Sequence, residues 1–213
     1  MTDRDNEIKW RKYFYPGTEV LMNNFGIKDY DMLKEAEATN SFQRLLELQE
    51  KPIDSDFGKK HLNAIHKYLF EDIYPFAGNY RDVNMMKKEE TFLNINTVLD
   101  IDRYLDELFE EVERQMMQCR SKHDFAEMLS KIYTQLIYCH PYREGNGRTI
   151  REFLREFSKA KSKEIGIEEV ELDWKKIDKE ELNRDIAFAH IFPGNTAMLF
   201  ENALTPVEKQ DYK

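Results

Sequence analysis

The sequence is poor in the residues that mark disulfide-rich, membrane-spanning or nucleic-acid-binding proteins. Its 213 residues include two cysteines, Cys119 and Cys139, which are too few for a disulfide framework. No apolar run approaches the roughly 18 residues typical of a transmembrane helix, and the N-terminus has no signal-peptide pattern. The net charge of −9 argues against the basic surface that usually binds nucleic acid. We therefore expect a reduced, cytoplasmic protein that binds neither nucleic acid nor membrane.

The composition favours one folded domain of ordinary size. Aromatic residues make up 13% of the chain and glycine occurs only eight times, which argues against disorder. A chain of 213 residues is long enough to bury a real core. We divide it into an N-terminal extension (1–28), a helical domain (29–204) and a polar tail (205–213).

Apolar residues recur at helical spacing through most of the chain, so we expect an all-α domain. The extension is polar and aromatic, and it ends in a turn at Pro16-Gly17. Short β-compatible pieces between Tyr80 and Ile95 flank a polar tip, which predicts one small hairpin. The expected helices cover about 31–49, 56–71, 101–116, 121–140, 146–157, 174–191 and 198–204, with Asp56, Ser121 and Asn146 as N-caps.

The stretch from His140 to Arg151 concentrates the groups used in nucleotide chemistry. Pro141 should end the helix that precedes it, and a Gly-Asn-Gly turn should open the next helix. A helix N-terminus binds anions through its free N–H groups, and glycines let the anion approach the backbone. The sequence therefore predicts a small polyanion site in an otherwise acidic protein.

Charged side chains around this turn suit a nucleotide and a metal ion. Arg148 and Arg151 share one face of the second helix and can grip phosphate oxygens. Glu144 can hold magnesium, which takes one or two carboxylates together with phosphate oxygens. His140 lies across the loop, where it can take a proton from an incoming hydroxyl.

The stretch resembles the signature of the Fic family, His-Pro-Phe-x-(Asp/Glu)-Gly-Asn-Gly-Arg-x-x-Arg, with one departure. Tyr142 stands where Phe is usual, so its buried ring brings a hydroxyl that needs a partner. The Gly145-Asn146-Gly147-Arg148 form is that of AMP-transferring members. The likeness extends over roughly 13–204, and it implies a Fic-type helical domain with a β-hairpin flap near 83–94 beside the active site.

The resemblance implies a protein adenylyltransferase that moves AMP from Mg-ATP to a Tyr, Thr or Ser hydroxyl, modifies itself and releases pyrophosphate. His140 would be the base, and Glu144 would hold Mg²⁺. The nucleotide-binding residues would be Gly145, Asn146, Gly147, Arg148 and Arg151. Alternatives are removal of AMP, transfer of another nucleotide monophosphate, and a silent module that binds nucleotide or a partner.

In the family a glutamate often restrains activity by pairing with the second motif arginine, here Arg151. It sits in a Ser/Thr-x-x-x-Glu-Gly/Asn helix of the same chain or of a small antitoxin-type inhibitor. Glu35 is our candidate, because its helix precedes the core, and Glu201 is the alternative. The N-terminus also looks like that of toxin-type members. An antitoxin-type inhibitor and a second copy of the chain are candidate partners besides the target.

Overall fold

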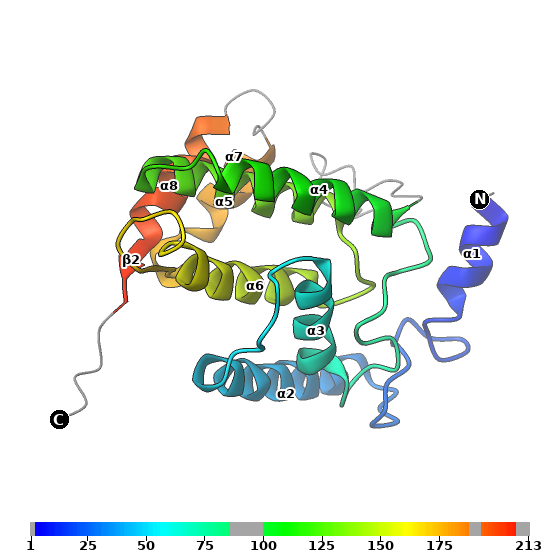
Figure 1. Cartoon of the computed structure of the whole chain (residues 1–213). Coiled ribbons are helices and arrows are strands. Elements are labelled where there is room, and N and C mark those ends of the chain that lie inside the picture. The colour runs from blue at the N-terminus through cyan, green and yellow to red at the C-terminus, as the bar shows by residue number, and fades with distance from the viewer. Residues whose placement is uncertain (1–2, 86–99, 188–192, 208–213) are drawn as a thin grey trace.

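Helices dominate the computed structural model, which describes residues 3–85, 100–187 and 193–207 (Figure 1). The all-α expectation is confirmed. Within this part of the chain no helix is both long and apolar enough to cross a membrane. The helices are α1 (Asp3–Arg11), α2 (Tyr30–Glu50), α3 (Lys59–Phe70), α4 (Ile101–Met116), α5 (Lys122–Cys139), α6 (Asn146–Lys161), the short 3₁₀ helix η1 (Trp174–Lys176), α7 (Lys179–Ala187) and α8 (Pro193–Ala203).

The core is built around α6, which packs against both α3 and α5. In Figure 1 α2 runs along the lower edge and α4 along the upper edge, with α6 between them. Phe153 and Leu154 of α6 are fully buried, as is Phe125 of α5. Burying each such side chain stabilises the fold by about 1.5–3 kcal/mol. The motif loop that opens α6 is thus attached to the most deeply packed helix.

Local capping signals place several helix ends as expected. α4 has its predicted bounds and is capped by Asp100, which accepts the N–H of Arg103 at 3.1 Å. Ser121 and Asp124 form a reciprocal capping box at the start of α5. Asp56 was predicted to cap α3, but α3 begins at Lys59. Asp56 instead accepts the N–H of Gly58, because a short Asp side chain readily closes a local turn.

The sheet lies where the sequence did not predict one. β1 (Val170–Leu172) pairs antiparallel with β2 (Leu204–Pro206), with Val170 opposite Pro206. Residues 205–206, assigned to the polar tail, therefore belong to the folded domain. The predicted hairpin at 80–95 lies mostly outside the described residues, and its described part, 80–85, contains no strand. Three-residue strands carry too short an alternation to be found without their partner.

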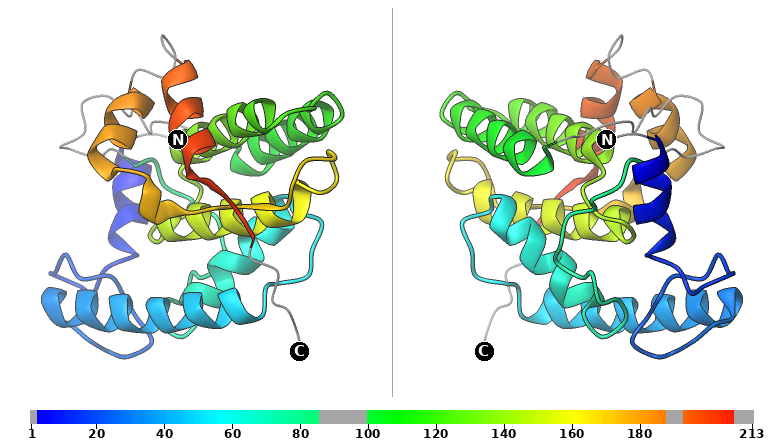
Figure 2. Two further views of the ribbon diagram at one scale, coloured as in Figure 1. Left: turned by 90° about the vertical axis from the view of Figure 1, so that its left-hand side faces the viewer. Right: turned by 90° about the vertical axis from the view of Figure 1, so that its right-hand side faces the viewer.

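The N-terminal extension contains the helix α1, which the sequence did not predict. α1 is short and polar, and Ile8 on it is 51% exposed. Isolated helices of this length are marginal in water and depend on packing against the rest of the fold. Figure 2 shows α1 at one side of the molecule, above the segment that leads from it to α2.

Candidate active site

His140 lies directly after α5, in a left-handed backbone conformation with φ of 47°. Its N–H donates to the Leu136 carbonyl at 2.9 Å, which closes the helix, and Pro141 prevents continuation. Buried Arg81 donates to the carbonyls of His140 at 2.7 Å and Cys139 at 3.1 Å. A cation at a helix C-terminus is favourable, so Arg81 fixes the backbone from which the His140 ring projects.

Tyr142 anchors the loop in the core, as its place in the motif predicts. Its fully buried ring stacks on His66 with centroids 3.7 Å apart, and its hydroxyl donates to Asn63 at 2.6 Å. The Asn146 side chain then closes the loop by pairing with both backbone groups of Tyr142, at 2.8 and 2.7 Å. The Asn146 amide group, predicted to hold phosphate, is therefore engaged within the loop.

His66, in its neutral form, holds the motif loop through a hydrogen bond to its backbone. Its Nδ1 accepts the N–H of Gly78 at 2.8 Å, so Nε2 carries the proton and donates to the Glu144 carbonyl at 3.0 Å. Burial lowers the pKa of His66 to about 4. Nothing in the spacing of His66 along the chain indicates that it contacts the motif.

Gly145 precedes α6 and is required by both conformation and space. Its φ is +82°, and a Cβ there would lie 2.3 Å from the Phe70 ring. α6 begins at Asn146, so Gly145, and not Asn146, is the N-cap residue. The first N–H groups of a helix have no partner within it. Together with Gly147, this start offers backbone donors to an anion.

Glu144 is the accessible carboxylate of the loop. Its side chain is 42% exposed, and one oxygen accepts the N–H of Gly145 at 2.9 Å. The same oxygen lies 3.7 Å from Nη2 of Arg148. The described residues contain no group of three or more His, Cys, Asp or Glu side chains placed to hold a metal. A single accessible carboxylate fits magnesium, which completes its coordination with phosphate oxygens and water.

Arg148 is held by residues of α2 that the sequence did not connect with the motif. Its guanidinium pairs with Glu37, donates to the Ser41 hydroxyl at 2.9 Å and lies 4.8 Å above the Phe70 ring centroid. The other oxygen of Glu37 accepts the Tyr74 hydroxyl. Burial and the Glu37 carboxylate raise the pKa of Tyr74, so Tyr74 stays protonated and donating.

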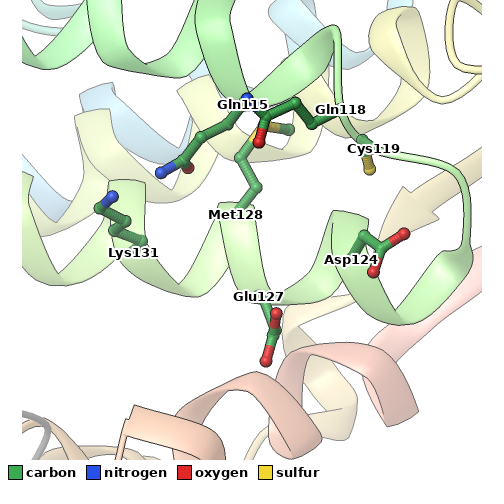
Figure 3. Close-up of a pocket in the computed structure, with 7 residues that line it drawn as sticks. All are labelled: Gln115, Gln118, Cys119, Asp124, Glu127, Met128 and Lys131. Atoms are coloured by element: carbon green, nitrogen blue, oxygen red, sulfur yellow. The ribbon is translucent and has the colours of Figure 1, made fainter.

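A cavity of about 300 Å³ borders these groups, with Glu37, Tyr74, Glu144 and Arg148 in its wall. Another hollow of about 340 Å³ lies between the end of α4 and the start of α5 (Figure 3). Its wall includes Cys119 and Lys131. The motif follows the opposite end of α5, and 18 residues of helix span about 27 Å. The first cavity therefore belongs to the motif, and the second does not.

Arg151 is exposed one turn further along α6, and its carbonyl accepts the indole N–H of Trp174 at 2.9 Å. Two neighbouring cations are a favourable setting for a polyphosphate. Arg155, by contrast, is buried in ion pairs with Glu152 and Glu171 and serves the structure.

The structure does not bring Glu35 to the motif. Glu35 is exposed on α2, whereas Glu37 faces Arg148. The side chains of residues two positions apart on a helix point in directions that differ by about 200°, so Glu35 and Glu37 lie on opposite faces of α2. Glu201, the alternative, contacts His123 at 2.6 Å near the start of α5. Glu37 also pairs with Arg148 and not with Arg151, the arginine that the family pattern indicates.

Comparisons with known proteins identify the family. The model of the Fic/DOC family matches residues 56–158. Protein adenylyltransferase VbhT of Bartonella schoenbuchensis is 30% identical over 188 residues, which are 88% of this chain and 37% of that protein. The chain thus spans well under half of VbhT. The probable protein adenylyltransferase y4lH of Sinorhizobium fredii is 34% identical over 142 residues, which are 66% of this chain and 71% of that protein.

A solved structure supports the same relationship. The N-terminal Fic domain of a Bartonella quintana effector protein, with bound ADP, superposes with a TM-score of 0.78 at 25% sequence identity. The match covers 93% of this chain and 96% of that chain. The likeness therefore includes the helices on both sides of the motif.

Proposed function

Because this chain belongs to the Fic/DOC family, we propose that it is a protein adenylyltransferase that moves AMP from ATP to a Tyr, Thr or Ser hydroxyl of a target protein. The observation that carries the proposal is the glycine loop at the start of α6, with His140, Glu144 and Arg148 arranged around it. Relatives named as adenylyltransferases and an ADP-bound structural neighbour support it.

His140 is the base of the proposed reaction. Its imidazole takes the proton of the target hydroxyl, and the resulting oxygen attacks the α-phosphorus of ATP. A new oxygen–phosphorus bond forms as the bond to the bridging oxygen of the β-phosphate breaks, and pyrophosphate leaves. Arg81 holds the His140 backbone during this step. Positioning supplies much of the rate, because the reacting groups are held in place.

The start of α6 holds the phosphates. The backbone N–H groups of Asn146 and Gly147 bind phosphate oxygens, and Gly145, whose own N–H donates to Glu144, gives the phosphate room to approach. Arg148 and Arg151 neutralise the outer phosphates. Glu144 would hold Mg²⁺, which neutralises phosphate charge when bound. The Asn146 side chain keeps the loop closed and so presents these donors.

Exposed apolar side chains on α2 support a protein partner besides the target. Met32, Phe42 and Leu46 are 61%, 62% and 45% exposed. An antitoxin-type inhibitor, which would make this a toxin-like protein, and a second copy of the chain both remain proposals. We also place the reaction in the cytoplasm, where ATP is available and cysteines stay reduced.

Mass spectrometry after incubation with ATP, magnesium and a cell lysate tests the function. We expect adducts of one AMP residue on the chain itself and on lysate proteins, and we expect excess EDTA to abolish them. Tight ATP binding without adducts would indicate a silent nucleotide-binding module. Release of AMP from already modified proteins would indicate the reverse reaction. Undiminished transfer in EDTA would contradict the role of Glu144 in holding magnesium.

A further inference from the structure

The N-terminal helix α1 contacts the chain on both sides of His140. On one side it reaches Arg143, which follows His140 in the motif loop. On the other it reaches residues 82–84, which follow Arg81, the side chain that holds the His140 carbonyl at 2.7 Å. α1 therefore connects the two backbone segments that define where His140 lies.

The contact with Arg143 is an aromatic box. The guanidinium lies 4.1 Å from the ring centroid of Trp10, 5.1 Å from that of Phe14 and 5.6 Å from that of Tyr13. Arg143 is only 8% exposed, and burial lowers the pKa of its guanidinium. A buried charge needs compensation, and aromatic faces attract a desolvated cation more strongly than an exposed one. The box thus fixes Arg143.

The contact with residues 82–84 is a set of hydrogen bonds and one ion pair. The Asn6 side chain accepts the N–H of Asn84 at 2.7 Å and donates to its carbonyl at 3.3 Å. Lys9 lies 3.4 Å from the Asp82 carboxylate, which also accepts the Tyr13 hydroxyl at 2.8 Å. An amide that satisfies both backbone groups of one residue fixes the direction of that backbone.

We propose that α1 is a positioning element for His140, acting through the Trp10–Arg143 box and the Asn6–Asn84 pair. The proposal rests on the proposed function, in which His140 takes the proton. α1 holds the two segments at a fixed separation, so the imidazole keeps its distance from the reacting hydroxyl. The phosphate-binding start of α6 is held separately by Phe70, His66 and Asn146. Loss of α1 contacts should therefore slow transfer without weakening nucleotide binding.

Trp10→Ala tests the box, with Trp10→Phe as the conservative variant and Glu7→Gln as the control. Glu7 is exposed on α1 and pairs with Arg11 on the same helix. At saturating ATP we expect Trp10→Ala to incorporate AMP into its own chain about tenfold more slowly, because small misplacements of reacting groups are costly. Trp10→Phe and Glu7→Gln should stay within about twofold of the unchanged protein, and ADP affinity should be the same for all four.

Hydrogen exchange separates this proposal from the proposed function. In Asn6→Ala the Asn84 amide loses its acceptor, so exchange in a peptide covering 81–85 should rise. In Trp10→Ala exchange should rise in a peptide covering 140–145. If no protein incorporates AMP but exchange rises as expected, the function fails and the contacts of α1 stand. Unchanged exchange, or an unchanged rate in a Trp10→Ala protein that binds ADP normally, would overturn the positioning role.

Discussion

Single side chains outside the motif determine how its charged groups are presented. Arg148 is directed by Glu37 and Ser41 of α2, more than a hundred residues earlier in the chain. Glu37 is itself held by Tyr74. The Arg148 guanidinium is thus held in place before a nucleotide arrives, an arrangement typical of a preorganised site.

Replacing Glu37 should weaken nucleotide binding. In Glu37→Ala the guanidinium of Arg148 loses its carboxylate partner and samples more conformations, so we expect ADP affinity to fall about tenfold. Glu35→Ala, an exposed change on the same helix, is the matched control and should have no effect. Calorimetric titration with ADP measures both. Tighter binding or faster self-modification in Glu37→Ala would instead show that Glu37 restrains the enzyme by competing with phosphate.

Replacing His140 should abolish transfer and spare binding. Asn tolerates the left-handed backbone at this position, so His140→Asn keeps the loop while it removes the imidazole. The Arg81 bond goes to the His140 carbonyl and survives the change. We expect no AMP incorporation and ADP affinity within about twofold of the unchanged protein. Transfer at a near-normal rate would show that another group takes the proton.

At the scale of elements, the start of α6 is where packing and chemistry meet. The helix is fixed to α3 by the close approach of Gly145 to Phe70 and by the bond from His66 to the Glu144 carbonyl. The geometry of the anion site therefore depends on how α3 and α6 pack. A side chain at Gly145 would separate these two helices.

Gly145→Ala should destabilise the fold far more than a similar change elsewhere. The new Cβ would lie 2.3 Å from Phe70, and an alanine is strained at a positive φ. Together these two effects should lower the free energy of unfolding by about 2–4 kcal/mol. Gly166 has a similar φ of +77°, but nothing lies within 4 Å of a Cβ there. Gly166→Ala should therefore cost only about 1 kcal/mol. Urea denaturation compares the two variants, and equal losses would contradict the packing argument.

At the scale of the whole molecule, the buried side chain of His66 couples folding to pH. His66 has a folded pKa of about 4 against an ordinary value of 6.5. Below pH 6.5 the unfolded chain therefore binds a proton that the folded chain does not. His66 thus contributes roughly 3 kcal/mol of stability above pH 6.5, and this is lost as the pH falls towards 4.

Thermal unfolding across this pH range tests the His66 contribution. We expect the melting temperature to fall more steeply between pH 6.5 and 4 in the unchanged protein than in His66→Gln, because the glutamine at position 66 does not titrate. His123→Gln is the control, because Glu201 raises the pKa of exposed His123. The contribution of His123 is present at low pH and is lost as the pH rises through its folded pKa. Parallel curves for the unchanged and His66→Gln proteins would exclude the proposed contribution of His66.

The amino-acid sequence by itself determined the helical class, the bounds of α4, the capping of α5, and the proposed chemistry of residues 140–151. These features depend on near neighbours along the chain: apolar spacing, a capping Ser or Asp, a proline after a helix, and an ordered motif. The roles of His140, Glu144, Arg148 and Arg151 were predicted in the same way and remain to be tested.

Only the tertiary structure decided which distant groups support the motif. Glu37 and not Glu35 faces Arg148, because a helix directs residues two apart to opposite sides. The contacts of His66 with Glu144 and of Trp10 with Arg143 join residues far apart in sequence. The β1–β2 pair does the same with strands of three residues. Such contacts arise from packing between elements, which periodicity along the chain does not specify.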